Sequence, residues 1–165
     1  MSELYSLFLK HPRISTDSRR IEPDSIFFAL RGANFDGNRF VAEALEKGAA
    51  YAVSDDAGVA AADERILYAE DTLKALQELA REPRRALGIP ILAISGSNGK
   101  TTTKELVSRV MAERFAVYAT RGNLNNHIGV PLTLLAMTRD TEFGVVEMGA
   151  STRGELTLLA SVAEP

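Results

Sequence analysis

In "ISGSNGKTTTKEL", residues 94–106, an apolar run ends in a glycine-rich turn that leads into a helical pattern. A turn between a strand and a helix points backbone N–H groups and the positive end of the helix dipole at one place, which attracts phosphate. Gly96 and Gly99 would let the backbone approach a ligand, Lys100 would place a charge on the terminal phosphates, and the Thr101 hydroxyl would ligate magnesium. The residues expected to contact the nucleotide are Gly96, Ser97, Asn98, Gly99, Lys100, Thr101 and Thr102.

The loop departs from the usual phosphate-binding motif at one position. That motif has a glycine five residues before the glycine that precedes the lysine, and here Ile94 stands in that place. An alternative interpretation is a helix start at which Gly99 and Lys100 have no ligand and the threonines only cap the helix. The strand pattern before the loop and the helix pattern after it favour the phosphate-binding interpretation.

A second polar feature follows the apolar run in "FGVVEMGAS", residues 143–151. Glu147 ends that run, and so it falls at the carboxyl end of a predicted parallel strand, the sheet edge at which ligands bind. A magnesium ligand is the natural role for this carboxylate, and an acid at a strand end without a metal is the alternative. Lys100 and Glu147 are therefore the candidate catalytic residues, and Thr101 and Glu147 the candidate metal ligands.

The whole chain alternates helical and strand-like patterns, which predicts an α/β fold. In the first half, helices are expected at residues 3–10, 39–48 and 71–82, and strands at 25–30, 50–55 and 65–69. In the second half, strands are expected at 89–95, 116–120 and 143–149, and helices at 103–115, 130–137 and 154–163. Three strands are fewer than the roughly five that a parallel-sheet domain needs to bury both faces.

The boundary between two units is expected near residues 84–88. Pro83 is predicted to end the preceding helix, and the basic cluster "REPRR", residues 81–85, is interpreted as a solvated linker, with a phosphate-binding patch as the alternative. Residues 1–84 would form one small α/β domain, and residues 88–165 the incomplete start of a parallel-sheet ATP-binding domain.

Composition excludes several classes of protein. The chain has 165 residues, no cysteine and a formal net charge of -3, so disulfides, thiolate metal sites and nucleic-acid binding by a global positive field are not expected. Any metal would be held by oxygen ligands or by the two histidines, and a hard cation such as Mg²⁺ fits that best. The longest apolar runs are too short for a membrane span or a signal peptide, which predicts a cytoplasmic protein with no membrane partner.

Three segments together resemble the Mur ligases of peptidoglycan synthesis. They are "GSNGKTTTKE", "TRGNLNNHIGVPLTLL" and "VVEMGASTRGEL", in that order, and the phosphate loop of that family lacks the glycine that Ile94 replaces. The asparagine-rich loop in the second segment suits orientation of a polyhydroxyl or amide substrate, although an asparagine-rich turn is the alternative. The segment "STDSRRIEPDSIFFALRGANFDGNRF" resembles the N-terminal, UDP-binding domain of the family, so the likeness extends from about residue 14 to 165.

The resemblance assigns further roles by position. Near the uridine or its diphosphate it places Thr16, Asp17, Ser18, Arg19, Asn34, Phe35, Asp36 and Gly37, and near the muramyl-peptide it places Asn123, Asn125 and Asn126. Many relatives carry asparagine and histidine where this chain has Ser151 and Thr152, so that pair receives no metal role. His127 stands where relatives often carry an acid and is interpreted as a polar loop residue, with a catalytic base as the alternative.

The activity that the resemblance implies uses ATP and Mg²⁺ to join D-alanyl-D-alanine to UDP-N-acetylmuramoyl-tripeptide through an acyl phosphate, in cell-wall synthesis that supports cell shape and division. Alternatives are another Mur-type or folylpolyglutamate synthase-like ligase, a non-catalytic nucleotide-binding module, and, as a poorer fit, a small-molecule kinase. Because the family's enzymes continue into further domains, this chain by itself is expected to bind and not to turn over. Its incomplete sheet predicts a marginally stable second unit or self-association.

Overall fold

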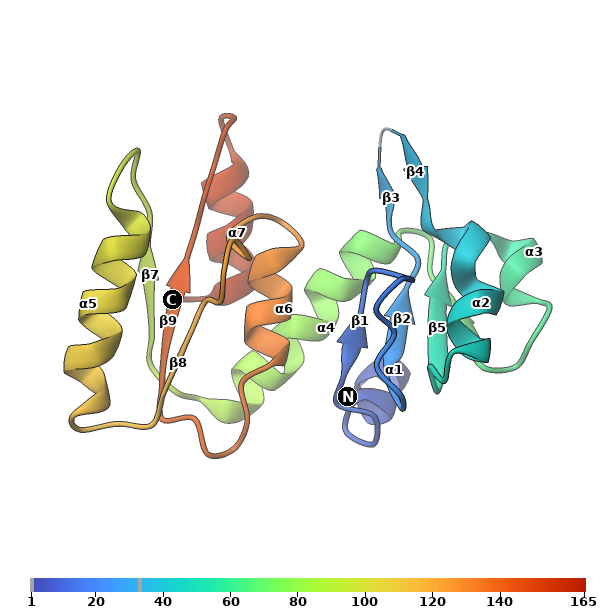
Figure 1. Cartoon of the computed structure of the whole chain (residues 1–165), viewed down its shortest axis with the longest axis horizontal. Helices are drawn as coiled ribbons and strands as arrows, with labels where there is room; N and C mark the ends of the chain where they lie inside the picture. Colours follow the sequence, from blue (N-terminus) through green and yellow to red (C-terminus); the bar gives the residue numbers. More distant parts are fainter. Residues whose placement is uncertain (1, 33) are drawn as a thin grey trace. The chain divides into compact units, whose positions relative to one another are not determined.

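The computed structural model describes residues 2–32 and 34–165, and its backbone contacts divide the chain into two compact units, Met1–Leu76 and Gln77–Pro165. Both units mix helices with parallel sheets, which confirms the predicted α/β class (Figure 1). The division falls inside a helix, and the assignment of residues 1–84 and 88–165 to two functional domains stays a prediction.

The first unit is built on a parallel sheet of four strands in the order β1-β2-β5-β6. The strands are β1 (Ile14–Ser15), β2 (Ile26–Phe28), β5 (Tyr51–Ser54) and β6 (Ile66–Tyr68). The apolar segments of β2 and β5 are buried, as central strands of a covered parallel sheet should be. The sequence patterns predicted every strand of this sheet except β1, whose two residues are too few to show a period.

Helices and a hairpin complete the first unit. They are α1 (Glu3–Phe8), the 3-10 helix η1 (Gly37–Phe40), α2 (Val41–Glu46), α3 (Ala57–Ala60) and the antiparallel strands β3 (Arg31–Gly32) and β4 (Phe35–Asp36). Helix α2 buries Val41, Ala44 and Leu45 against Phe27 and Ala52 of the sheet, which forms the core of this unit. The sequence patterns did not predict the hairpin, because strands of two residues are too short to show a period.

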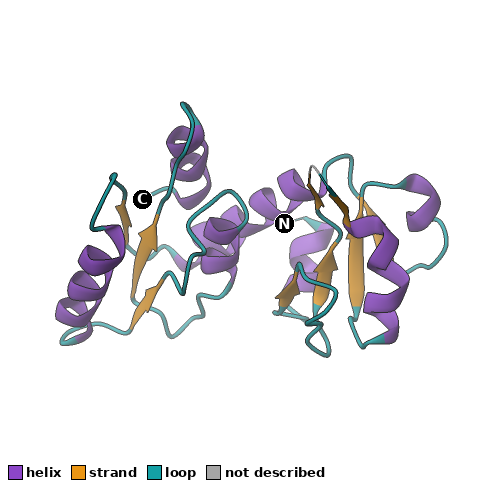
Figure 2. Cartoon of the chain, turned by 45° about the horizontal axis from the view of Figure 1, so that its top comes forward, coloured by secondary structure: helices purple, strands orange, loops and turns teal. Residues whose placement is uncertain are grey.

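The second unit holds the three parallel strands that were predicted, and the structure gives their order in the sheet as β7-β9-β8. Its strands are β7 (Ile91–Ile94), β8 (Val117–Ala119) and β9 (Phe143–Glu147), and its helices are α5 (Lys100–Ala112), α6 (Gly129–Leu135) and α7 (Glu155–Ala163). Helix α5 lies on one side of the sheet, and α6 and α7 lie on the other (Figure 1; Figure 2 shows the same elements by type). Because β9 is the central strand of a parallel sheet, its carboxyl end lies between those of β7 and β8.

Helix α4 (Thr72–Leu87) corrects two expectations about residues 81–88. Pro83 lies inside the helix and does not end it, although proline removes one backbone donor. The residue after Pro83 makes contacts that favour this continuation of the helix: the Arg84 guanidinium donates to the carbonyl oxygens of Ile89, Ala163 and Glu164 at 2.8–3.0 Å.

The basic cluster is therefore no solvated linker. Arg84 satisfies carbonyl groups at the C-terminal end of α7, where a cation is favoured, and Arg85 forms an ion pair with Glu164. This ion pair holds the pKa of the Glu164 carboxyl below its usual range. The cluster therefore attaches the second half of α4 to α7.

Large apolar side chains remain exposed on the second unit. They are Leu92, Leu106, Val110, Phe115, Leu156 and Leu158. Leu106 and Val110 are one helical turn apart on α5 and are 60% and 70% exposed.

Within the described residues, no helix has both the length and the apolarity that crossing a bilayer requires.

Candidate functional site

The predicted phosphate loop lies between β7 and α5 and contains two glycines in the left-handed backbone region. Gly96 and Gly99 have positive φ angles of 143° and 76°, a backbone conformation that residues with a Cβ rarely adopt. Gly99 is also the residue that precedes the first turn of α5, so the free N–H groups of that turn open onto the loop. The Lys100 ammonium donates to the Gly96 carbonyl at 2.7 Å, and so it lies folded over the loop.

Glu147 lies beside this loop at the end of the central strand. Its backbone pairs with Ile94, the last residue of β7, and its side chain is only 2% exposed. One carboxylate oxygen, Oε2, accepts a hydrogen bond from the Thr101 hydroxyl at 3.0 Å, and the other, Oε1, accepts one from the Asn125 amide at 2.9 Å. The structure thus brings together three predicted site residues from α5, β9 and the asparagine-rich loop.

The donor set at this edge fits a magnesium ion that arrives with a nucleotide. A carboxylate and a hydroxyl supply hard oxygen ligands, and Mg²⁺ usually takes one or two such groups plus phosphate oxygens and water. Among the described residues there is no group of three or more His, Cys, Asp or Glu side chains able to hold an ion alone. The residues therefore suit a metal shared with phosphate and not a closed protein cage.

The three predicted asparagines occupy different positions. Asn125 binds the Glu147 carboxylate, whereas the Asn126 side chain accepts from the backbone N–H groups of Ile128 and Gly129 and so caps the start of α6. Asn123 is exposed, and its carbonyl accepts from the Asn125 N–H at 2.8 Å. Of the three, Asn125 contacts the Glu147 carboxylate, whereas the Asn126 side chain is bonded to the backbone at the start of α6.

The neighbouring polar residues have local partners as well. The backbone N–H groups of Ser151 and Thr152 donate to the Glu155 carboxylate at the start of α7, and these bonds hold the pKa of Glu155 below its usual range. The carbonyl of the exposed His127 accepts from the Gln77 amide at 3.0 Å.

The first unit contains a pocket of about 480 Å³. Its lining residues are Thr16, Asp17, Ser18, Arg19, Phe35 and Phe40. The rings of Phe35 and Phe40 are nearly parallel, with centroids 5.5 Å apart. Five of these residues were predicted site residues; Phe40 was not, because its position before α2 was interpreted only as part of a core helix.

An ion pair shapes the polar side of this pocket. Asp17 accepts hydrogen bonds from the Nε and Nη2 groups of Arg19 at 2.9 and 2.8 Å, and from its backbone N–H at 3.0 Å. These bonds hold the pKa of the Asp17 carboxyl well below its usual range. The Arg19 side chain is 86% exposed, so its guanidinium is available to an anionic ligand.

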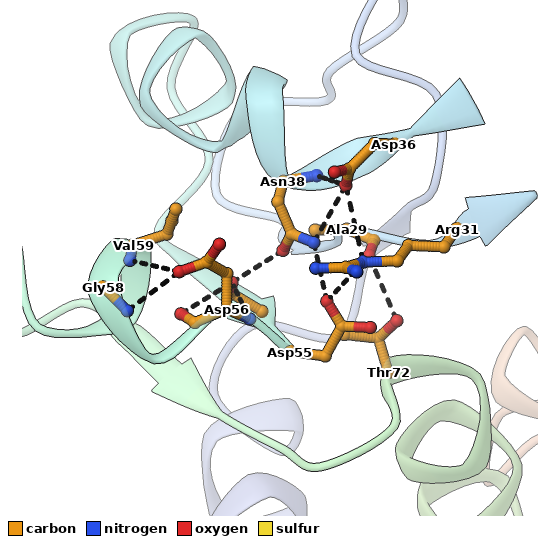
Figure 3. A network of polar contacts seen from close by, with 10 residues as sticks. Ala29, Arg31, Asp36, Asn38, Asp55, Asp56, Gly58, Val59 and Thr72 are labelled. Atoms are coloured by element: carbon orange, nitrogen blue, oxygen red, sulfur yellow. Dashed lines mark hydrogen bonds and ion pairs between the residues drawn. The ribbon is translucent and has the colours of Figure 1, made fainter. Parts of the chain in front are cut away.

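A polar network ties the β3–β4 hairpin to the sheet (Figure 3). Arg31 lies 2.9 Å from Asp55 and 3.6 Å from Asp36, and the Asn38 amide donates to both carboxylates, at 2.6 and 2.9 Å. The Ser54 hydroxyl, at the end of β5, donates to the Asn38 carbonyl oxygen at 2.7 Å. The network fixes β4, the strand that carries Phe35. The Asp36 carboxylate is itself part of the network, through Asn38 and Arg31.

The other two residues of the predicted "NFDG" site are placed as follows. Asn34 is exposed in the turn of the hairpin. Gly37 lies against the backbone of Ala29 and Leu30, where an added Cβ would come within 2.6 Å of the Leu30 carbonyl oxygen. Gly37 therefore allows a close approach of two backbone segments.

Acid should destabilise the chain through its paired carboxylates. The backbone N–H of Asn38 lowers the pKa of Asp36, and the Arg65 side chain lowers that of Asp63 to about 2. A lowered folded-state pKa gives stability that is present above the unfolded value of about 4 and is lost as the pH falls toward the folded value. We expect the melting temperature to fall between about pH 4 and pH 2, and to fall less steeply in Asp63→Asn. Thermal unfolding followed by circular dichroism checks this, and a melting temperature that rises on acidification would contradict it.

Comparison with known proteins places this geometry in a family. The model of the "Mur ligase family, catalytic domain" matches residues 12–84, and that of the "Mur ligase middle domain" matches residues 94–165. The UDP-N-acetylmuramoyl-tripeptide--D-alanyl-D-alanine ligases of Bacillus subtilis and of a Synechocystis strain are each 45% identical over 154 residues, which are 92% of this chain.

Solved structures agree with these matches. A MurF crystal structure from Acinetobacter baumannii superposes with a TM-score of 0.86 at 35% identity, over 93% of this chain and 34% of that one. MurF ligase from Thermotoga maritima, solved in complex with ADP, superposes with a TM-score of 0.85 at 32% identity, over 99% of this chain and 36% of that one. The chain spans about a third of the length of the curated relatives it matches, 34% for the two named above.

Proposed function

The chain belongs to the Mur ligase family, and on that premise we propose that it supplies the UDP-substrate site and much of the ATP site of a ligase. The ligase would join D-alanyl-D-alanine to UDP-N-acetylmuramoyl-tripeptide, the substrates in the names of its relatives. The observation that carries the ATP part is the 3.0 Å contact between the Thr101 hydroxyl and the Glu147 carboxylate beside a glycine loop with positive φ angles.

The proposed reaction transfers the γ-phosphoryl group of ATP to the terminal carboxylate of the tripeptide, which gives an acyl phosphate and ADP. The amine of D-alanyl-D-alanine then attacks the acyl carbon, the amide bond forms, and inorganic phosphate leaves. Lys100 and the N–H groups of the loop would stabilise the charge on the transferring phosphoryl group. Magnesium, held by Thr101 and Glu147, would neutralise charge on the phosphates when bound.

We propose that the two sites of this chain bind their ligands without completing the ligation. The matched relatives are about three times as long, so the ligase activity is proposed for the whole protein. Titration calorimetry of the 165-residue chain with ATP, with Mg²⁺ and with EDTA, tests the nucleotide site. Saturable binding that is tighter with Mg²⁺ would support the proposal, and heats no larger than dilution in both buffers would contradict it.

Arg19 offers a direct test of the UDP site. The Arg19→Met variant should bind UDP-N-acetylmuramoyl-tripeptide at least about tenfold more weakly, because a hydrogen bond to a charged group contributes about 1.5–3 kcal/mol. Arg20→Met is the matched control, since Arg20 is an exposed neighbour outside the pocket lining. Calorimetry on both variants measures the difference. Equal affinities would remove Arg19 from the site.

We also propose that copies of this chain associate through the incomplete sheet of the second unit and the apolar side chains of the helix packed on it, which include Leu106 and Val110. Sedimentation at increasing protein concentration should show a concentration-dependent rise in mass, and Val110→Lys should reduce it. A monomer at all concentrations would contradict this part of the proposal.

A further inference from the structure

Lys104 is a buried cation for which the proposed reaction gives no role. Its side chain is 4% exposed, although lysine is almost never fully buried unless it is paired. Its ammonium group donates to the carbonyl oxygen of Thr120 at 2.8 Å and lies 3.1 Å from a carboxylate oxygen of the half-exposed Glu105. An apolar side chain of similar length would avoid the cost of desolvating a charge, so stability alone is a weak explanation for a lysine here.

Thr120, the partner of Lys104, connects the ends of two strands. It follows β8, is 2% exposed, and its backbone N–H donates to the Val145 carbonyl of β9 at 2.9 Å. Its hydroxyl accepts a hydrogen bond from the backbone N–H of Glu147, also at 2.9 Å. Hydrogen bonds therefore run from Lys104 on α5, through Thr120, to the backbone of the residue whose carboxylate faces the phosphate loop.

The same helix contacts both strand ends. Thr101 and Lys104 are three residues apart and so lie on one face of α5. Thr101 contacts the Glu147 carboxylate at the end of β9, and Lys104 contacts Thr120 at the end of β8. Two neighbouring contacts fix the first turns of α5 against the sheet edge.

We propose that Lys104 is a positioning residue for nucleotide-bound magnesium. By holding α5 against Thr120, it keeps the Thr101 hydroxyl and the Glu147 carboxylate at the spacing that a shared ion requires. This inference rests on the proposed ATP site. Lys104 itself would touch neither the ion nor the phosphates. It would act by fixing the positions of Thr101 and Glu147, which would.

The test compares the magnesium dependence of ATP binding in the 165-residue chain. Loss of a group that orients a metal ligand typically costs 10–100-fold in metal affinity. In Lys104→Met, the Mg²⁺ concentration that gives half of the gain in ATP affinity should rise about tenfold or more, while ATP affinity in EDTA should change less than about twofold. Arg109→Met, which removes an exposed cation from the same helix, is the control and should match the unaltered chain.

A second pair of variants keeps the test valid if Lys104→Met does not fold. Thr120→Val removes the hydroxyl that holds the Glu147 backbone and should raise the Mg²⁺ concentration needed, as Lys104→Met does. Thr120→Ser keeps the hydroxyl and should show the magnesium dependence of the unaltered chain. Unshifted dependence in Lys104→Met and Thr120→Val, or equal weakening with and without Mg²⁺, would overturn the inference and leave the ATP site standing. Absence of magnesium-dependent ATP binding in the unaltered chain would overturn both.

Discussion

The Lys100→Ala variant should bind magnesium ATP about 10- to 100-fold more weakly than the unaltered chain. In the structure the Lys100 ammonium lies over the glycine-rich loop, held by the Gly96 carbonyl at 2.7 Å. Phosphate oxygens would be stronger acceptors for that ammonium than a neutral carbonyl. Hydrogen bonds to charged groups contribute about 1.5–3 kcal/mol, and each 1.4 kcal/mol is a tenfold change in affinity. Calorimetric titration with magnesium ATP measures the effect.

The control for this variant is Arg109→Ala, which removes an exposed cation from the last turn of α5. It should leave ATP affinity within about twofold, because interactions between exposed charges are screened by salt beyond about 10 Å. Circular dichroism should give the same melting temperature for the two variants. If Lys100→Ala bound magnesium ATP as tightly as Arg109→Ala, the glycine loop would not be the phosphate site.

The Gly129→Ala variant should lose about 3 kcal/mol of stability in the second unit. Gly129 is the first residue of α6, and an added Cβ would lie 2.3 Å from the carbonyl carbon of Leu124 and 2.4 Å from its Cα. These are backbone atoms, so no side-chain rotation relieves the overlap, and overpacking of this kind costs about 1–3 kcal/mol or more. Thermal unfolding should show a fall of about 12 °C or more, at roughly 4–8 °C per kcal/mol for a unit of this size.

Helix propensity predicts the opposite sign for this substitution. Alanine favours a helix over glycine by about 1 kcal/mol, so a stabilised Gly129→Ala would show that the close approach to Leu124 is absent. Gly122→Ala is the matched control: Gly122 has a φ of 55° and open space around its Cβ position, so only the left-handed conformation costs about 1–2 kcal/mol. Because Leu124 precedes Asn125, Gly129→Ala should also weaken magnesium-dependent ATP binding.

Much of the second unit could be predicted because its strands are continuous apolar runs and its loops carry distinctive residues. The run before Gly96 and the run that ends at Glu147 predicted two parallel strands, and their carboxyl ends do meet at one edge. The contact of Thr101 with Glu147 follows from that topology. A strand pattern does not reveal its neighbours, so the order β7-β9-β8 required the structure.

Other features depend on contacts between distant residues and left no local pattern. Pro83 predicted a helix end, but Arg84 binds carbonyl groups some 80 residues away and α4 continues. Phe40 lines the pocket beside Phe35, which the hairpin places against it, and this contact has no local sequence pattern. Lys104 has the spacing of an ordinary helix residue, and its burial depends on the position of Thr120, which follows β8.

Titration of the unaltered chain with UDP-N-acetylmuramoyl-tripeptide tests most directly whether this is the substrate-binding part of a ligase. The pocket lined by Ser18, Arg19 and the stacked Phe35 and Phe40 rings should give saturable binding with one ligand per chain, tighter than binding of UDP alone. Binding of magnesium ATP without any binding of the UDP-linked peptide would contradict the account and leave a nucleotide-binding module.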